Sequence, residues 1–394
     1  MKPARIGIYL KNGGPHSGPG RYVRSLLNAA DPREFEMVVL GQSSRIGAIA
    51  VPDAARPARS LARQLTPFAV KYWMGFNRET RRLSDSMRAG EFDLQHTNDT
   101  GCEESALAAR LAGVPVVLGT LHVLPDVDVE RQRRRWVHRQ LARRGVNALD
   151  LAIAVSDAAK DAWKRYSGLP DSRIVTIHNG INPHEFQRRR PAAQARAALG
   201  IPTDDGSIVI GTVARLSRVK GLEYLIDAAA RLRTQGLNIR VLIAGDGELL
   251  GELREHAGRS GVASCVHFVG HRADVPAALE AMDIFAIPSL SEALPYAVME
   301  AMAMELPVVG SDVGGVPEIV AVGQTGLLTP ARDSDALAVA LRRLVESADL
   351  RERMGRAGRQ RIIDRFDERR MAEQTLDIYR SALRATRTTQ GVAA

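Results

Sequence analysis

Residues 288–305 read Pro288-Ser-Leu-Ser-Glu292-Ala-Leu-Pro-Tyr-Ala-Val-Met-Glu300-Ala-Met-Ala-Met-Glu305, and they carry the strongest fold and site signal of the chain. Two carboxylates, Glu292 and Glu300, stand eight positions apart, the first in a loop and the second inside a predicted helix over residues 295–304. Pro295 suits the first helical turn, where its missing N–H is not needed. The helix is apolar on nearly every face, which predicts burial. A buried carboxylate needs hydrogen-bond donors, and a pair of sugar hydroxyls is one such partner.

The chain has 394 residues, which exceeds a typical single core and predicts two domains. Its hydrophobic content of 45% and charged content of 25% are those of an ordinary soluble globular protein. No stretch approaches the ~20 apolar residues that a membrane-spanning helix needs, and the start of the chain does not read as a signal peptide. The two cysteines lie far apart in sequence, which argues against a structural disulfide or zinc site and favours a reducing cytoplasm.

The net charge of +9 is concentrated in the first half, where residues 1–185 hold 27 Lys and Arg against 19 Asp and Glu. Within a predicted helix over residues 129–144, four arginines recur every four residues and form one stripe: Arg131, Arg135, Arg139 and Arg143. Such a stripe is either a solvated helix face or a patch for anionic lipid headgroups or a pyrophosphate-linked acceptor. Peripheral attachment to the inner face of a membrane therefore stays open beside a simple cytoplasmic location.

Short β-rich runs alternate with helical stretches, which predicts parallel sheets covered on both faces. Glycine, two prolines and a charge run over residues 179–191 suggest an exposed connector between two such blocks. The expected architecture is two Rossmann-like, doubly wound α/β domains facing across a cleft. Residues 1–180 form the first domain, residues 181–370 the second, and residues 371–394 a final helix and tail.

Two glycine-rich or basic loops follow predicted strands. Asn12-Gly13-Gly14-Pro-His-Ser-Gly-Pro-Gly20 precedes a helix, and its glycines allow close backbone approach to a ligand. Gly211-Thr-Val-Ala-Arg215-Leu-Ser-Arg-Val-Lys220-Gly221 places two cations five residues apart beyond a strand end. Arg215 as a fork and Lys220 as a point charge suit a diphosphate, although either cation alone is also ordinary surface chemistry.

Weaker signals come from three further strand ends. Gly245 lies in a strand-to-helix turn that is typical of nucleotide-binding edges, and Arg272 follows another strand. His122 comes just after the apolar run 114–118, which places it at the carboxyl edge of a parallel strand. A lone histidine is usually structural, but this position favours a site.

Together these motifs resemble glycosyltransferase family 4, the large group of retaining GT-B enzymes, over nearly the whole chain and most strongly from Gly211 to Glu300. The resemblance implies a GT-B fold whose C-terminal helix returns to the first domain. It also implies roles for the motif residues. Arg215 and Lys220 hold the donor diphosphate, while Glu292 and the backbone N–H groups of Ala293 and Leu294 meet the sugar or phosphate. Glu300 binds ribose hydroxyls, His122 lies by the donor sugar, Gly13 and Gly14 line the donor–acceptor junction, and Gly245 and Arg272 complete the nucleotide edge.

The resemblance implies a retaining transfer of sugar from a nucleotide-sugar, with a UDP-sugar favoured, to a hydroxyl acceptor in polysaccharide or glycolipid assembly. No metal and no cofactor are expected, because Arg215 and Lys220 can stabilise the leaving diphosphate and because the Asp-x-Asp at Asp126-Val-Asp128 stands in no suitable place. Transfer to a small soluble aglycone, a nucleotide-sugar 2-epimerase of the same fold, and a nucleic-acid-binding protein are the alternatives. The last finds no recognition motif and few aromatic stacking platforms.

Overall fold

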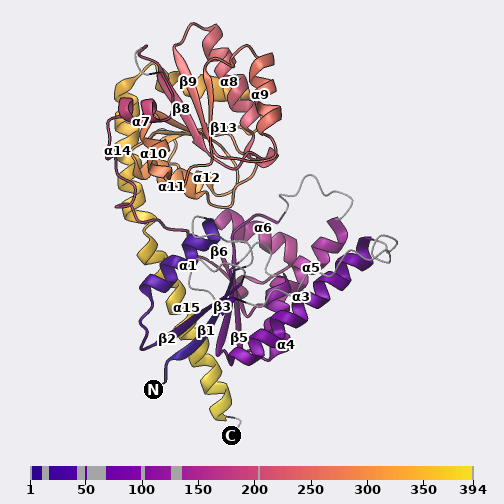
Figure 1. Ribbon diagram of the computed structural model, residues 1–394. Helices are drawn as coiled ribbons and strands as arrows, with labels where there is room; N and C mark the ends of the chain where they lie inside the picture. The colour runs from indigo at the N-terminus through magenta and orange to yellow at the C-terminus, as the bar shows by residue number, and fades with distance from the viewer. Residues whose placement is uncertain are drawn as a thin grey trace. The chain divides into compact units, whose positions relative to one another are not determined.

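The computed structural model describes residues 2–10, 17–41, 49–50, 68–98, 103–125, 135–202 and 205–392. The chain divides into two compact units. The first contains Met1–His178 together with the C-terminal segment Arg369–Ala394, and the second contains Asn179–Glu368. Each unit has its own parallel sheet, as Figure 1 shows, and its own hydrophobic core.

The first unit is built on a seven-stranded parallel sheet in the order β3-β2-β1-β4-β5-β6-β7. The strands are β1 (Ala4–Leu10), β2 (Phe35–Gly41), β3 (Ile49–Ala50), β4 (Leu94–Thr97), β5 (Val116–Leu121), β6 (Leu151–Ala154) and β7 (Ile174–Thr176). Most positions of β1, β4, β5 and β6 are buried, which is the signature of a strand covered on both faces. The sheet is doubly wound, as the sequence predicts.

Helices cover both faces of this sheet. Figure 1 shows α1 (Gly18–Ala29) and α15 (Glu368–Val392) on one face and α3 (Phe68–Gly90), α4 (Glu103–Ala112) and α5 (Arg135–Asn147) on the other. Local chemistry fixes the ends of α6 (Asp157–Ser167), where the Ser156 hydroxyl accepts from the Ala159 N–H and Gly168 adopts the left-handed conformation.

The C-terminal helix α15 belongs to the first unit, as expected for the GT-B fold. Leu376 and Tyr379 are buried in the same core as Ile6 and Ile8 of β1. The Arg380 guanidinium donates to both oxygens of Glu34 at 2.8 and 2.9 Å, which anchors the helix beside the start of β2. The last helix of the chain is therefore a structural part of the first sheet domain.

The second unit contains a six-stranded parallel sheet in the order β10-β9-β8-β11-β12-β13. The strands are β8 (Ile208–Val213), β9 (Ile239–Ala244), β10 (Val266–Gly270), β11 (Ile284–Ile287), β12 (Val308–Ser311) and β13 (Gly326–Thr329). Its helices are α7 (Ala192–Ala198), α8 (Leu222–Thr234), α9 (Leu250–Arg259), α10 (Val275–Glu280), α11 (Tyr296–Ala303), α12 (Val316–Ile319), α13 (Ser334–Val345) and α14 (Ala348–Arg365). This too is a doubly wound sheet.

Helix α11 is the helix predicted over residues 295–304, and every residue from Val298 to Ala303 is buried. The prediction of a buried Glu300 is confirmed, because only 3% of the residue is exposed. Pro295 differs slightly from its expected place, since it is the N-cap with extended backbone angles and stands just before the first turn. Its lack of an N–H costs nothing there either.

The connector expected over residues 179–191 is only partly the exposed segment that its charge run suggests. Asn179 and Phe186 are buried, whereas Arg188 and Arg189 are exposed and Arg190 is half-buried. The fully buried carboxylate of Glu280 accepts from the Arg189 backbone N–H and from the Arg190 side chain, each at 2.7 Å. The connector is therefore exposed along its arginines and is still attached to the second unit. Its partner is a carboxylate at the C-terminus of α10, which local sequence does not reveal.

We predict that Glu280→Ala lowers the free energy of unfolding by about 2–4 kcal/mol, because the change removes a buried charge and its hydrogen bonds to the connector. Urea unfolding followed by circular dichroism measures the loss. Glu346→Ala is the matched control, since Glu346 pairs with Arg342 on an exposed helix face and its loss costs roughly 0.5 kcal/mol or less. Equal midpoints for the two variants would contradict the structural role of Glu280.

Candidate functional site

The order of strands in the second sheet reverses between β8 and β11, because successive connections run outward from these two strands in opposite directions. Ligands of open α/β sheets bind beyond the carboxyl ends of the strands at such a switch point. Arg215 and Lys220 follow β8, and Glu292 follows β11. Three residues singled out by sequence therefore stand at the carboxyl edge of the two strands that define the switch point.

The two loops beyond these strands are bound to each other. The Leu290 N–H donates to the Val219 carbonyl at 2.8 Å. Gly221 adopts a left-handed conformation with φ of 59°, and a Cβ at this position would lie 2.2 Å from the Pro288 carbonyl oxygen. Only glycine permits both the backbone angle and this close approach.

A charge pair joins the same loops. The Lys220 ammonium donates to Glu292 Oε1 at 2.7 Å, and the Ser289 hydroxyl donates to the same oxygen at 2.6 Å. The carboxylate of Glu292 is 9% exposed, and its backbone carbonyl accepts from the Gly315 N–H at 3.1 Å. The carboxylate is thus fixed in orientation, and the lysine, with 26% of its side chain exposed, keeps a route to solvent or ligand.

Ala293 and Leu294 follow Glu292 and are buried, with exposed fractions of 7% and 4%. The buried side chain of Asn179 donates from Nδ2 to the Leu294 carbonyl at 3.2 Å, and this contact lies entirely within the second unit. It orients the peptide group just before Pro295 and α11. Glu300 lies further along the chain inside that helix, so the loop and the helix that follows it carry the two carboxylates.

Arg215 follows β8, as Lys220 does, whereas Gly245 and Arg272 follow β9 and β10 of the same sheet. Arg215 is 75% exposed in its side chain and stands 3.8 Å from a carboxylate oxygen of Glu248, a weak surface pair that a ligand can replace. Gly245 has φ of 145°, and a Cβ there would come within 1.8 Å of the Ala214 carbonyl. Arg272 is exposed just after β10.

His122 follows β5 in the first unit and is half-buried. Its Nε2 is 2.8 Å from Asn98 Oδ1, and the edge of its ring meets Tyr22 with 5.3 Å between ring centroids. Burial lowers the pKa of His122 to about 3, and the neighbouring His96 adds to this effect. The histidine is therefore neutral throughout the physiological pH range.

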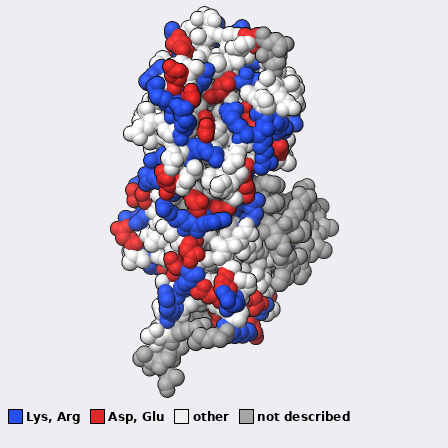
Figure 2. Space-filling view, turned by 90° about the vertical axis from the view of Figure 1, so that its left-hand side faces the viewer, with Lys and Arg blue, Asp and Glu red and all other residues white. Residues whose placement is uncertain are grey.

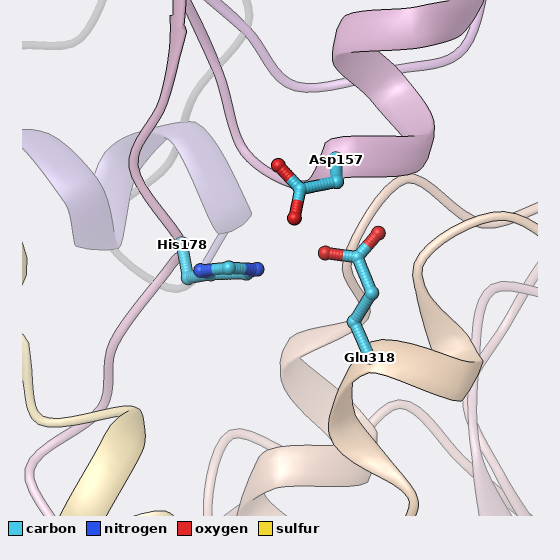
Figure 3. Close-up of side chains that lie close together, drawn as sticks. All are labelled: Asp157, His178 and Glu318. Atoms are coloured by element: carbon cyan, nitrogen blue, oxygen red, sulfur yellow. The ribbon is translucent and has the colours of Figure 1, made fainter.

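Two more titratable side chains stand at the carboxyl edge of the first sheet, although no sequence motif marks them. Asp157 begins α6, and its Oδ1 accepts from the Thr176 hydroxyl at 2.6 Å. His178 follows β7, and Figure 3 shows its ring and the Asp157 carboxylate facing each other. The figure also labels Glu318 of α12, whose backbone carbonyl accepts from Arg361 at 2.9 Å inside the second unit.

Several predicted residues lie outside the described residues. Gly13 and Gly14 of the first loop are among them, as are Arg131 and the Asp126–Asp128 pair. Arg135, Arg139 and Arg143 belong to α5, the described part of the helix predicted over residues 129–144. Sequence reasoning also missed Ser289, Asn98 and the side-chain role of Asn179. Position at the carboxyl end of a strand was the available signal for Asn98, but a neutral amide carries no chemical signature of its own.

Two Rossmann-like units, with the last helix of the chain returned to the first, define the GT-B class of glycosyltransferases. A family model described as Glycosyltransferase Family 4 matches residues 16–185, and a model described as Glycosyl transferases group 1 matches residues 195–361. The chain belongs to glycosyltransferase family 4 and is a glycosyltransferase.

Relatives of known name agree with this assignment. Alpha-maltose-1-phosphate synthase of Mycolicibacterium smegmatis is 33% identical over 307 residues, which cover 72% of this chain and 77% of the relative. D-inositol 3-phosphate glycosyltransferase of Corynebacterium urealyticum is 30% identical over 399 residues, covering 95% and 90%. Both are named as a synthase or transferase, so the 2-epimerase alternative has no support among them.

Solved structures show the same fold. HepE of Anabaena in complex with UDP has a TM-score of 0.75 at 23% identity, covering 97% of this chain and 100% of that chain. Sucrose-phosphate synthase from Thermosynechococcus elongatus has a TM-score of 0.79 at 22% identity, also covering 97% and 100%. The GT-B fold predicted from the sequence is confirmed.

Proposed function

We propose that the protein is a retaining, metal-independent glycosyltransferase that moves a sugar from a UDP-sugar to a hydroxyl acceptor. The observation that carries the proposal is the Lys220–Glu292 pair, a cation and an oriented carboxylate fixed at the switch point of the second sheet. The presence of UDP in HepE, and of UDP-glucose in another structure of that protein, supports a uridine nucleotide as the donor. A UDP-sugar therefore remains the first donor to test, ahead of GDP- and ADP-sugars.

The proposed reaction proceeds on one face of the sugar. The bond between the anomeric carbon and the phosphate oxygen breaks, and the acceptor oxygen forms its bond on the same face. The acceptor proton passes to the leaving phosphate. Lys220 and Arg215 stabilise the negative charge that develops on the diphosphate, and Glu292 holds the transferred sugar by its hydroxyls. The neutral His122 orients the sugar and does not serve as the base.

The acceptor is proposed to be a growing polysaccharide or a glycolipid, with a small soluble aglycone as the alternative. Within the described residues, no helix is both long enough and apolar enough to cross a membrane. Acceptors at a membrane would then be reached through surface charge, for which the arginine stripe of residues 131, 135, 139 and 143 is the proposed element. On the face drawn in Figure 2, by contrast, basic and acidic side chains are interspersed, so that face offers no single-sign surface for nucleic acid.

We predict that Glu300→Ala weakens binding of free UDP by about 10- to 100-fold, because the proposed partner of this buried carboxylate is the ribose. Glu292→Ala should instead lower kcat while leaving UDP affinity nearly unchanged, because its proposed partner is the transferred sugar. Isothermal titration with UDP and steady-state kinetics separate the two. Glu346→Ala controls for loss of an acidic residue from the second unit. Unchanged UDP binding in the Glu300 variant would sink its assignment.

We predict that EDTA leaves transfer largely intact and that Lys220→Ala lowers kcat/KM by about 10²–10³-fold, because the lysine supplies the charge that other enzymes take from a metal ion. Lys164→Ala, which removes a surface lysine paired with Asp171, is the control for general charge loss. The measurement is product formation with and without chelator. Activity abolished by EDTA and restored by manganese would contradict metal independence.

We predict that replacing the four stripe arginines by glutamine reduces sedimentation with anionic vesicles, because each surface cation contributes about 1 kcal/mol near a charged bilayer. The effect should fade as salt shortens the Debye length. A charge-matched control replaces four exposed arginines of α13 and α14, namely Arg342, Arg343, Arg353 and Arg356. Equal sedimentation of wild type and stripe variant at low salt would show that the stripe is only a solvated helix face, and it would favour a soluble acceptor.

A further inference from the structure

Asn98 stands at the carboxyl end of β4 and is fully buried. Three contacts hold it. Its backbone N–H donates to the Tyr9 carbonyl of β1 at 2.9 Å, and its side-chain Nδ2 donates to the Pro19 carbonyl of α1 at 2.8 Å. Its side-chain Oδ1 lies 2.8 Å from His122 Nε2. One residue thus connects the first strand, the first helix and the histidine of the candidate site.

These contacts determine which way the amide points. The Pro19 carbonyl can only accept a hydrogen bond, so the NH₂ group of Asn98 must face it. The amide oxygen then faces His122, and an amide oxygen also can only accept. Turning the amide over would set an oxygen against the Pro19 oxygen at a fully buried position, which costs a hydrogen bond and adds repulsion. The proton of the ring therefore lies on Nε2.

The surroundings keep His122 neutral. Among the described residues of the first unit, the titratable groups that the structure places against it are Tyr22 of α1, through a ring contact, and His96 of β4, through an electrostatic one. His96 is buried between the Tyr379 hydroxyl at 2.5 Å and the Thr120 hydroxyl at 2.8 Å, and burial lowers its pKa to about 3. No carboxylate among these contacts favours a second proton on either ring, so one proton on Nε2 leaves a lone pair on Nδ1.

We propose that Asn98 is a positioning residue that locks His122 in the neutral tautomer protonated at Nε2, so that His122 meets a substrate hydroxyl with Nδ1 as a hydrogen-bond acceptor. The catalytic half of this proposal rests on the proposed function, which places His122 beside the sugar. The tautomer itself does not, because it follows from the contacts of Asn98 alone. A histidine locked in this way can receive a hydroxyl proton in a hydrogen bond but cannot donate one from Nδ1.

The direct test is a nitrogen NMR spectrum of ¹⁵N-histidine-labelled protein without substrate, in which a protonated ring nitrogen and one with a lone pair have well separated shifts. The His122 signals are assigned by their loss in His122→Gln. Wild type at neutral pH should show Nε2 protonated and Nδ1 bare. Asn98→Ala should show both tautomers. A proton found on Nδ1 in the wild type overturns the proposal.

Asn98→Asp provides the second readout. A carboxylate beside Nε2 stabilises the imidazolium, so the pKa of His122 should rise and Nδ1 should gain a proton as the pH falls. Transfer by this variant should then fall by about 10-fold or more on the acid side and recover at higher pH, while the wild type shows no such limb. An Asn98→Asp variant with the pH profile and ring shifts of the wild type also overturns the lock.

Thr97→Val is the matched control, because the Thr97 hydroxyl is buried one residue away and donates to the Leu118 carbonyl at 3.2 Å. It should keep the wild-type tautomer and pH profile even if it lowers stability. If the wild-type spectrum shows the Nε2-protonated ring but transfer is unchanged in both Asn98 variants, the positioning role is overturned, whereas the assignment of the tautomer holds. A failure of the sugar-transfer activity itself shows in the activity assay of the wild type and leaves the spectrum untouched.

Discussion

Two loops meet at the carboxyl ends of β8 and β11, and their meeting is the constraint on which the candidate donor site depends. Gly221 allows the two loops to meet, because any side chain at this position would collide with the Pro288 carbonyl. Once the loops are in contact, Lys220 and Glu292 are near enough to pair at 2.7 Å. Partial burial strengthens the attraction between the two charges but also costs desolvation, and the Ser289 hydroxyl offsets part of that cost by donating to the same oxygen. The backbone contact between the two loops thus sets the distance at which the lysine and the carboxylate can pair.

Burial of a carboxylate alone does not mark a site in this protein. Glu280 is more deeply buried than Glu292, yet it is not part of the candidate site. Its partners are the connector backbone and Arg190, and it attaches the connector to the rest of the second unit. Glu292 pairs instead with a lysine in a glycine-dependent loop beyond a strand end. The difference lies in the partner. A carboxylate that binds the connector is structural, whereas a carboxylate paired with a partly exposed lysine at a switch point can share that lysine with a bound ligand.

The sequence predicts α11 and every strand except β3 and β13, because apolar strands and an all-round apolar helix depend on local composition. It misses α14, whose residues 348–365 are rich in arginine and include two glycines. Gly355 reads as a helix breaker, but a Cβ there would lie 2.1 Å from the Glu305 carbonyl, so the glycine is required by packing. Arg359 and Arg361 of the same helix donate to backbone carbonyls of Phe186 and Ile319. These partners are distant in sequence, and no local pattern contains them.

The first unit shows the same limit in its polar core. Tyr22 bonds to Thr375 at 2.7 Å, and His96 bonds to Tyr379, so two hydroxyls from the last helix satisfy two buried groups near the start of the chain. Without these partners each buried group would lose a hydrogen bond that water cannot replace. Tyr22 in turn packs its ring against His122. The return of α15 to the first unit therefore has a structural consequence for the candidate site. It completes the buried hydrogen-bond network that holds Tyr22, against which the His122 ring packs.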